Sequence, residues 1–454
     1  MLHREKLWTV AGPEFGSEGS VMIIMRALYG LKSSGAAWRS TLAVTKGTLG
    51  YRPTQADPDV WIKQATKQDG EPYCKLMLIS VDDVLHIAKH PEEVMAKLGR
   101  EYRLKDSVDP PDRYLGGNIE KVQTDDGSVA WSLSCYDYLI NAVQQVKDEL
   151  SQKNLMLKQF GTGLRPYPAC YRPEVDVTPV LDQERTNRFQ QLVGILRWAI
   201  ELGRIDILTE VSCLSQHLAE PREGHIVVVY KIFKYLSLRL KSSKGGIVFN
   251  GESMFIDSAT FNDFNREECL DFYHDAREDF PIKMPEQLGN PVHVLAYVDV
   301  NHARNMKTRR SHTGIILYIN QAPIIWYSKR QNTVEASSFG SEYIALRICT
   351  EMVEALRYKL RCFGVPVQGS SDILCDNKSV VTTSSVPTSV LNKRHNALCY
   401  HRVREAQAAG MIRVGWIEWE KNIADLFTKT MLSNESKRKF VQFIFDICNA
   451  TAMT

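Results

Sequence analysis

Four carboxylic acids in the last third of the chain lie in apolar surroundings, where a solvated acid is not expected. Asp299 lies within LAYVDV, Asp376 directly follows ILC, Asp425 lies within NIADLF, and Glu342 begins a long helical pattern. Burying an unpaired carboxylate is costly unless a cation or hydrogen bonds compensate. Hard divalent cations take oxygen ligands, and two of them about 4 Å apart can stabilise both oxygens of a reacting phosphodiester. The four acids therefore indicate a two-metal site, with helix or turn capping as the alternative role for each.

The elements that must position these acids follow from the pattern of residues 291–432. Three β-rich runs joined by short polar turns precede a long helix, and two further strands each precede a helix. This order predicts one α/β domain with a mixed five-stranded sheet. The expected elements are the strands VHVLAYVDV, SHTGIILYIN and PIIWYSK, the helix Ser341–Phe363, the strand DILCDN, a helix through His401–Ala409, the strand MIRVGWI and a helix near Asn422–Thr430.

The remaining chain divides into regions of different character, which makes the protein multidomain, α/β and α+β. Residues 1–110 alternate β-like runs with turns, and KLMLISVDDVLHIAK reads as two strands joined by an acidic turn. Residues 111–250 are expected to be mostly helical. Residues 251–290 hold ten acidic and three basic residues and are expected to be a solvated linker, and residues 433–454 a C-terminal tail.

Composition excludes several classes of protein. The chain has 454 residues, 44% of them hydrophobic, and its net charge is only +3, too small to indicate nucleic-acid binding by itself. It contains neither a membrane-spanning apolar run nor a signal peptide, so membrane and secreted proteins are excluded. The ten cysteines are widely scattered, which argues against zinc knuckles and favours reduced thiols inside the cell.

Basic residues are concentrated beside the expected site. They follow the first and third strands of residues 291–432, and two more flank the segment LYGLK. Side chains there could neutralise phosphates next to a metal site, although an ordinary solvated face is the alternative. The candidate nucleic-acid contacts are Arg304, Lys307, Arg309, Arg310, Lys329, Arg330, Arg26 and Lys32.

The motifs resemble those of copia-type LTR retrotransposon Pol polyproteins, in the same order over nearly the whole chain. AYVDVNHARNMKTRRSHTGIILYINQAPIIWYSKRQNTVEASSFGSEYIAL, LCDNKSV and NIADLFTK resemble the ribonuclease H domain. RALYGLKSSGAAW, ADPDVWI, LISVDDVLHIAK and YRLKDSVDPPDRYLGGNIE resemble the later half of the reverse transcriptase. RFQQLVGILRWAIELGRIDILTEVSCLSQHLAEPREGH resembles the thumb and connection region. The weakest stretch is 251–290.

The resemblance implies a role for each acid. Asp299, Glu342, Asp376 and Asp425 would bind two Mg²⁺ ions, or Mn²⁺, that cleave the RNA strand of an RNA/DNA hybrid. The sequence departs from the family at three positions outside this set. Asn301 and Gly340 stand where acids are common, and Gly415 stands where some ribonucleases H have a histidine.

The resemblance also implies that residues 1–110 are part of a polymerase palm. Asp82 and Asp83 match the acidic pair that binds the polymerase metals, and Ser80 replaces an aromatic residue. The family's first catalytic Asp lies upstream of LYGLK and is not in this chain, so polymerase activity on template-primer is not expected. The upstream reverse transcriptase and the integrase are absent as well. The expected location is intracellular, in the cytoplasm within a virus-like particle or in the nucleus.

Three hypotheses of function result: an active ribonuclease H, a non-catalytic remnant that at most binds nucleic acid, and an RNA-directed DNA polymerase. The four acids favour the first, whereas Ser80, Asn301 and the truncation favour the second. A competing metal site would use His395, Cys399 and His401, but no fourth ligand lies at suitable spacing. Helix-surface and core roles are the simpler interpretation of those three residues.

Overall fold

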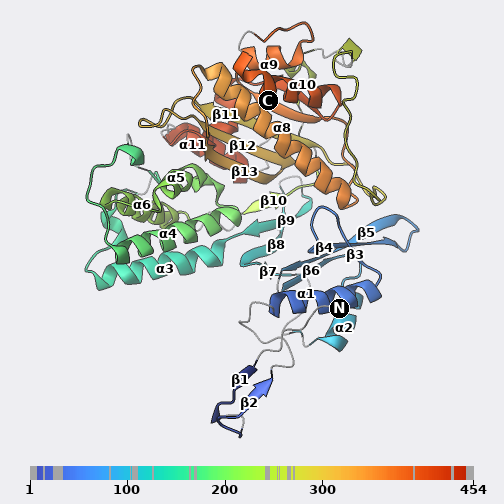
Figure 1. Ribbon diagram of the computed structural model, residues 1–454, viewed down its shortest axis with the longest axis vertical. Helices are drawn as coiled ribbons and strands as arrows, with labels where there is room; N and C mark the ends of the chain where they lie inside the picture. The colour runs from blue at the N-terminus through green and yellow to red at the C-terminus, as the bar shows by residue number, and fades with distance from the viewer. Residues whose placement is uncertain are drawn as a thin grey trace. The chain divides into compact units, whose positions relative to one another are not determined.

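A computed structural model describes most of the chain, and Figure 1 shows the arrangement of its elements. The chain divides into two compact units, residues 1–109 and 110–454, which are considered separately here. The described residues are 8–13, 16–23, 34–80, 83–102, 104, 111–124, 127–162, 165–167, 171–240, 246–252, 254, 256–262, 267–268, 271–391, 394–430 and 434–445. Among the helices they form, none has the length and apolar character needed to cross a bilayer.

The first unit contains a four-stranded antiparallel sheet, in the order β3-β4-β5-β6, and a separate two-stranded hairpin. Its core packs Leu42 of the first helix and Leu98 of the second against Trp61 and Met77 of the sheet. Neither helix was predicted from the sequence. The elements are β1 (Trp8–Val10), β2 (Val21–Ile23), α1 (Ser34–Thr48), β3 (Arg52–Pro53), β4 (Val60–Thr66), β5 (Pro72–Ser80), β6 (Asp83–Ile87) and α2 (Glu92–Glu101).

The two strands expected around the acidic turn are present. Ser80 at the end of β5 pairs with Asp83, the exposed first residue of β6. The prediction of a β-hairpin at this position is therefore confirmed for its strands. Asp82 of the turn, and the basic candidates Arg26 and Lys32, lie outside the described residues.

The second unit begins with a four-stranded sheet and a group of helices. The helices at 183–201 and 223–238 confirm the helical prediction, and Phe189, Leu196 and Phe233 on them are fully buried in one core. The sheet, in the order β10-β9-β8-β7, was not predicted. The elements are β7 (Arg113–Tyr114), β8 (Gly117–Gln123), β9 (Val129–Ser134), α3 (Tyr136–Gln152), α4 (Gln183–Glu201), α5 (Leu208–Leu214), α6 (Glu223–Leu238) and β10 (Ile247–Phe249).

The mixed five-stranded sheet predicted for residues 291–432 is present, in the order β13-β12-β11-β14-β15. The first three strands are antiparallel neighbours. Strand β14 pairs in parallel with β11, and β15 pairs in parallel with β14. Parallel neighbouring strands require a crossover connection, which the intervening helices supply. The strands are β11 (Val294–Asn301), β12 (His312–Ile319), β13 (Ala322–Arg330), β14 (Ser371–Cys375) and β15 (Ile412–Trp416).

Both faces of this sheet are covered, because alternate residues of β11 point into different cores. Ala296 and Val298 pack with residues of the long helix that follows β13, and Leu295 and Tyr297 pack with Phe427 on the opposite face. The helices are α8 (Ser338–Cys362), α9 (Lys378–Ser385), α10 (Ala397–Ala408), α11 (Asn434–Phe445) and the short 3₁₀ helix η10 (Ile423–Phe427). Helix α11 lies within the residues expected to be a tail.

Helix α8 begins earlier than predicted. Its first residue is Ser338, and the side chain of Ser337 accepts a hydrogen bond from the backbone N–H of Gly340. Because Ser337 already supplies this N-terminal cap, Glu342 lies a full turn inside the helix. The alternative that Glu342 caps the helix is therefore wrong.

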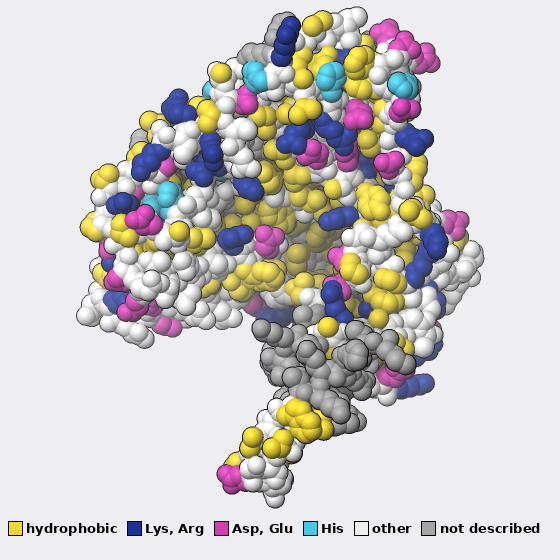
Figure 2. Space-filling model, viewed as in Figure 1, with side chains coloured by type: hydrophobic (Ala, Val, Ile, Leu, Met, Phe, Trp, Pro, Cys, Tyr) yellow, Lys and Arg dark blue, Asp and Glu magenta, His cyan; other side chains and the backbone are white. Residues whose placement is uncertain are grey.

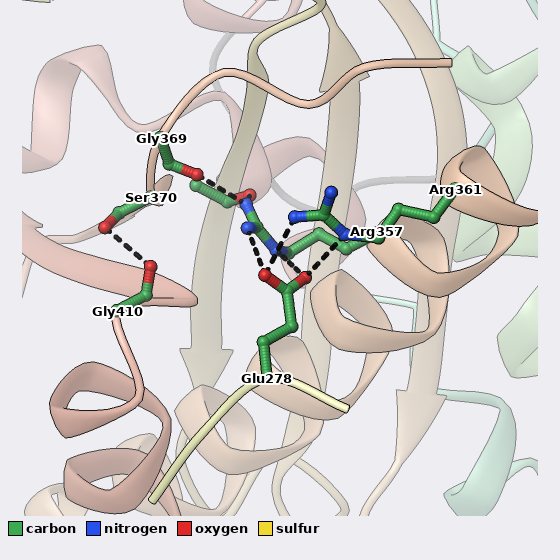
Figure 3. A network of polar contacts seen from close by, with 7 residues as sticks. Glu278, Arg357, Arg361, Gly369, Ser370 and Gly410 are labelled. Carbon is green, nitrogen blue, oxygen red and sulfur yellow. Dashed lines mark hydrogen bonds and ion pairs between the residues drawn. The ribbon is translucent and has the colours of Figure 1, made fainter. Parts of the chain in front are cut away.

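The acidic stretch before the sheet is fastened to α8 through Glu278. Its carboxylate accepts hydrogen bonds of 2.8 Å from Arg357 Nε and Nη2, and of 3.1 and 2.8 Å from Arg361 (Figure 3). Arg357 also donates to the carbonyl of Gly369 and to Ser371. Burial alone would raise the pKa of Glu278, but the two guanidinium groups outweigh it and hold the pKa below its usual value. The segment around Glu278, called the strap below, is therefore packed against α8 and is not a solvated linker.

Helix α5 packs against the outer strand β13 and supports the segment that carries Asp425. The Thr209 hydroxyl donates to the carbonyl of Leu426 at 2.7 Å, and the Ser212 hydroxyl donates to the carbonyl of Ser328 at 2.6 Å. The helical region and the five-stranded sheet are therefore connected by side-chain hydrogen bonds.

Buried His312 should make the folded protein sensitive to acid. Its Nε2 lies 2.8 Å from Ser328 Oγ, and burial, with the charges of Arg304 and Arg330, lowers its pKa to about 3. The unfolded chain therefore binds this proton below pH 6.5 while the folded protein excludes it, so stability falls as pH falls from 6.5 toward 3. At pH 4.5 the loss should be about 2–3 kcal/mol.

Urea unfolding at pH 7 and pH 4.5 measures this loss. We expect His312→Gln to show a smaller decrease between the two pH values than the wild type, and His274→Gln, at an exposed histidine, to match the wild type. Equal decreases in all three proteins would contradict the assignment.

Candidate metal centre

Asp299 and Asp376 lie side by side because of the register between the parallel strands β11 and β14. Val298 of β11 pairs with Cys375 of β14, and each acid is the next residue of its chain. The carboxyl ends of neighbouring parallel strands meet at one edge of a sheet, so both side chains reach the same place. Asp299 is buried and Asp376 is half-buried.

Asp425 reaches the same place on η10, which packs against β12 and β11. Gly314 of β12, the register partner of Asp299, makes this possible: a Cβ there would lie 2.8 Å from the carbonyl oxygen of Ala424 and 2.9 Å from Cβ of Phe427. Asn422 donates to the carbonyl of Val298 at 3.0 Å. The close approach at Gly314 thus brings Asp425, which is 3% exposed, next to Asp299.

The structure brings the four predicted acids together as two overlapping groups. Oxygens of Asp299, Asp376 and Asp425 all lie within 4.8 Å of one another, and so do ligand atoms of Glu342, Cys375 and Asp376. Asp376 belongs to both groups and so joins Glu342 on α8 to the other two acids.

The acids make one another harder to ionise. Burial raises the pKa of Glu342 well above its usual value, and the charges of Asp299 and Asp376 raise it further. Burial, followed by the charge of Asp299, raises the pKa of Asp376 to about 6, and the same two causes raise the pKa of Asp425. Mutual repulsion of this kind is relieved by a cation.

The residues fit a divalent metal ion. Their donors are carboxylate oxygens, which Mg²⁺ and Mn²⁺ prefer. Within the described part of the chain, Glu342 Oε2 is buried without a hydrogen-bond partner, and an ion could satisfy it. The Cys375 thiol is a poor ligand because burial raises its pKa well above its usual value.

Two further residues of the site were not found from the sequence. The Thr428 hydroxyl donates to Asp299 Oδ2, and the Lys429 ammonium donates to Asp425 Oδ1 and lies 3.8 Å from Asp299 Oδ2. The spacing of four residues between Asp425 and Lys429 is the signal that could have identified the lysine.

The basic candidates near β11 and β13 have different surroundings. Arg304 uses its guanidinium inside the protein, donating to Cys213 Sγ at 2.7 Å and to Thr430 Oγ1 at 3.0 Å. Arg310 and Arg330 line a small hollow, together with Gln216 and His217. The remaining candidates, Lys307, Arg309 and Lys329, are exposed.

Charge on the visible face is mixed. Figure 2 shows Lys and Arg side chains scattered among acidic and apolar ones on that face. The small net charge of the chain does not attract nucleic acid by itself, so binding would depend on the basic groups beside the acids.

The alternative histidine and cysteine site is not assembled in the described residues. His395 pairs with Glu335 at 3.2 Å, and His401 Nδ1 lies 2.8 Å from the Tyr273 hydroxyl. Neither belongs to the groups of close ligand atoms found among those residues. These contacts agree with surface and packing roles.

Comparison with known proteins confirms the resemblance to copia-type Pol polyproteins. The chain is 24% identical over 411 residues to the retrovirus-related Pol polyprotein from transposon RE1 of Arabidopsis thaliana, covering 90% of this chain and 24% of the relative. It is 24% identical over 427 residues to that from transposon TNT 1-94 of Nicotiana tabacum, covering 92% and 28%. The truncated transposon Ty1-A Gag-Pol polyprotein of Saccharomyces cerevisiae is 21% identical over 436 residues, covering 94% and 32%.

The chain thus spans about a quarter of the length of the two plant polyproteins. No protein-family model matches it. Among solved structures, the N-terminal RNase H domain of rv2228c from Mycobacterium tuberculosis is similar, with 15% identity, a TM-score of 0.24 and coverage of 34% of this chain and 98% of that one. LC11-RNase H1 in complex with an RNA/DNA hybrid has 16% identity, a TM-score of 0.25 and coverage of 33% and 99%.

Proposed function

We propose that residues 291–432 of this relative of copia-type Pol polyproteins form a ribonuclease H that hydrolyses the RNA strand of RNA/DNA hybrids. The observation that carries the proposal is the meeting of Asp299, Asp376 and Asp425 within 4.8 Å, with Glu342 joined through Asp376. Four acids gathered at the end of two buried strands destabilise a protein unless they bind a cation.

The four acids would hold a pair of divalent ions, Mg²⁺ or Mn²⁺. When bound, the ions would activate a water molecule and stabilise the leaving 3′ oxygen of the RNA strand. Thr428 orients Asp299 through its hydroxyl, and Asn422 fixes η10 against β11. These contacts limit the motion of the carboxylates before substrate arrives.

Basic side chains beside the site would bind the sugar–phosphate backbone of the hybrid. Five positive charges are available, on the turn after β11 and at the end of β13: exposed Lys307, Arg309 and Lys329 and half-buried Arg310 and Arg330. Contacts of this kind are independent of sequence and weaken as salt rises. Since Arg304 donates to Cys213 and Thr430, its part is to hold the turn that carries Lys307, Arg309 and Arg310.

The similarity to copia-type Pol polyproteins also suggests roles for the other regions of the chain. We propose that residues 1–110 are part of a reverse-transcriptase palm with Asp82 and Asp83 as its acidic pair, and that residues 111–250 are thumb and connection. Residues 251–290 would join this part to residues 291–432, and residues 433–454 would follow the ribonuclease H. Template-primer nucleic acid would be the partner of the palm.

Cleavage of a labelled RNA strand in an RNA/DNA duplex by the full chain tests the function. We expect cleavage with Mg²⁺, none with EDTA, and a loss of about a thousandfold or more in Asp376→Asn. Asp271→Asn, at an exposed acid, should cut like the wild type. A folded protein that binds the hybrid without cutting it would contradict the proposal and favour the non-catalytic remnant.

A further inference from the structure

Lys429 places a positive charge directly on the acids of the metal centre. Its Nζ forms an ion pair with Asp425 and lies 3.8 Å from Asp299 Oδ2. The lysine follows η10, four residues after Asp425, and its side chain is 35% exposed while the two carboxylates are 5% and 3% exposed. The ammonium thus lies at the solvent side of the cluster.

The ammonium contacts only some of the acids in the cluster. It contacts two of the three acids in the group formed by Asp299, Asp376 and Asp425. Glu342, on the other side of Asp376, keeps a buried oxygen without a hydrogen-bond partner among the described residues. Lys429 therefore pairs directly with the Asp425 side of the cluster and makes no direct ion pair with Glu342 among the described residues.

A lysine can be displaced from such a position. Its charge is a compact ammonium on a flexible four-carbon stem, and the exposed part of the side chain gives it a path to water. A divalent ion carries twice the charge of the ammonium and is coordinated by several oxygens at once, so it can replace the ammonium at the same carboxylates.

We propose that Lys429 is a built-in counter-cation that stabilises the metal-free site and competes with the divalent ion for Asp425 and Asp299. The inference rests on the metal-binding role proposed above for the four acids. In this role Lys429 has two effects. It balances the charge of the acids without metal, so that folding does not depend on the ion, and it lowers the apparent metal affinity below what the four acids alone would give.

Binding of Mn²⁺ to the full chain, followed by electron paramagnetic resonance of the free ion, tests the competition. In Lys429→Met we expect Mn²⁺ to bind about tenfold more tightly, because the ion no longer has to displace an ammonium from Asp425 and Asp299. Lys429→Arg, which keeps the charge, should bind like the wild type. Lys421→Met, at a half-exposed lysine in the same segment, should also be unchanged.

Thermal unfolding in EDTA supplies the second readout. We expect Lys429→Met to unfold at a lower temperature than the wild type without metal and to gain more from added Mn²⁺. Equal or weaker Mn²⁺ binding by a folded Lys429→Met would overturn the inference. If the variant folds only with Mn²⁺, the counter-cation role is supported, since the metal then replaces the lost charge.

The two proposals fail in different ways. Wild-type binding of Mn²⁺ that is lost in Asp376→Asn but unchanged in Lys429→Met would overturn only the role of the lysine. If neither the wild type nor Lys429→Met binds Mn²⁺ at these acids, the metal site itself is overturned and the competition with it.

Discussion

Asp299→Asn is expected to reduce cleavage of the hybrid by about a thousandfold or more while leaving the metal-free protein at least as stable as the wild type. Asparagine keeps the shape of the side chain and can still accept the hydrogen bond from Thr428. It removes the charge that, after burial, contributes most to raising the pKa of Glu342, Asp376 and Asp425. The loss of a metal ligand therefore comes with relief of repulsion.

Initial cleavage rates with Mg²⁺ and thermal unfolding in EDTA measure the two effects on the same protein. Loss of activity together with an equal or higher unfolding temperature would indicate that Asp299 serves function at a cost in stability. Asp271→Asn is the matched control at an exposed acid. If Asp299→Asn unfolded at a much lower temperature, Asp299 would be primarily a structural acid and the metal site would be in doubt.

Glu278→Ala is expected to lower the free energy of unfolding of the second unit by about 3–5 kcal/mol. The change leaves the guanidinium groups of Arg357 and Arg361, whose side chains are 3% and 12% exposed, without their shared carboxylate. Removing one partner of a buried ion pair costs more than the pair contributes, because the remaining charge stays desolvated.

Urea unfolding of the full chain checks this loss. Asp279→Ala, at the exposed neighbouring acid, should be within about 0.5 kcal/mol of the wild type. Glu278→Gln should lose less than the alanine variant because its amide oxygen still accepts a hydrogen bond. Equal stability of all four proteins would show that the strap is held by other contacts.

The five-stranded sheet and the meeting of its acids could be predicted because both follow from local pattern. Asp299 lies inside an apolar strand and Asp376 directly follows one, and parallel pairing of the two strands places the acids at neighbouring positions. The position of Asp425 depends on the close packing at Gly314, more than a hundred residues earlier, which a single sequence does not reveal.

Charge composition was a weaker guide than strand pattern. It describes residues 251–290 as acidic, but the surroundings of Glu278 depend on two arginines 79 and 83 positions away. The pairing of β10 with β9 was missed for a similar reason, because the two strands lie more than a hundred residues apart in the chain. Pairings of this range are set by packing of the whole unit and leave little local signal.

The acid cluster of residues 291–432 is supported from outside its own sheet. The peptide after Asp425 is held from outside the sheet by Thr209 of α5, and the basic turn after β11 is held by Cys213 at the other end of that helix. Substitutions in α5 are therefore expected to disturb the position of the acid cluster without altering any of its four acids. The helical region and the five-stranded sheet depend on each other for this geometry.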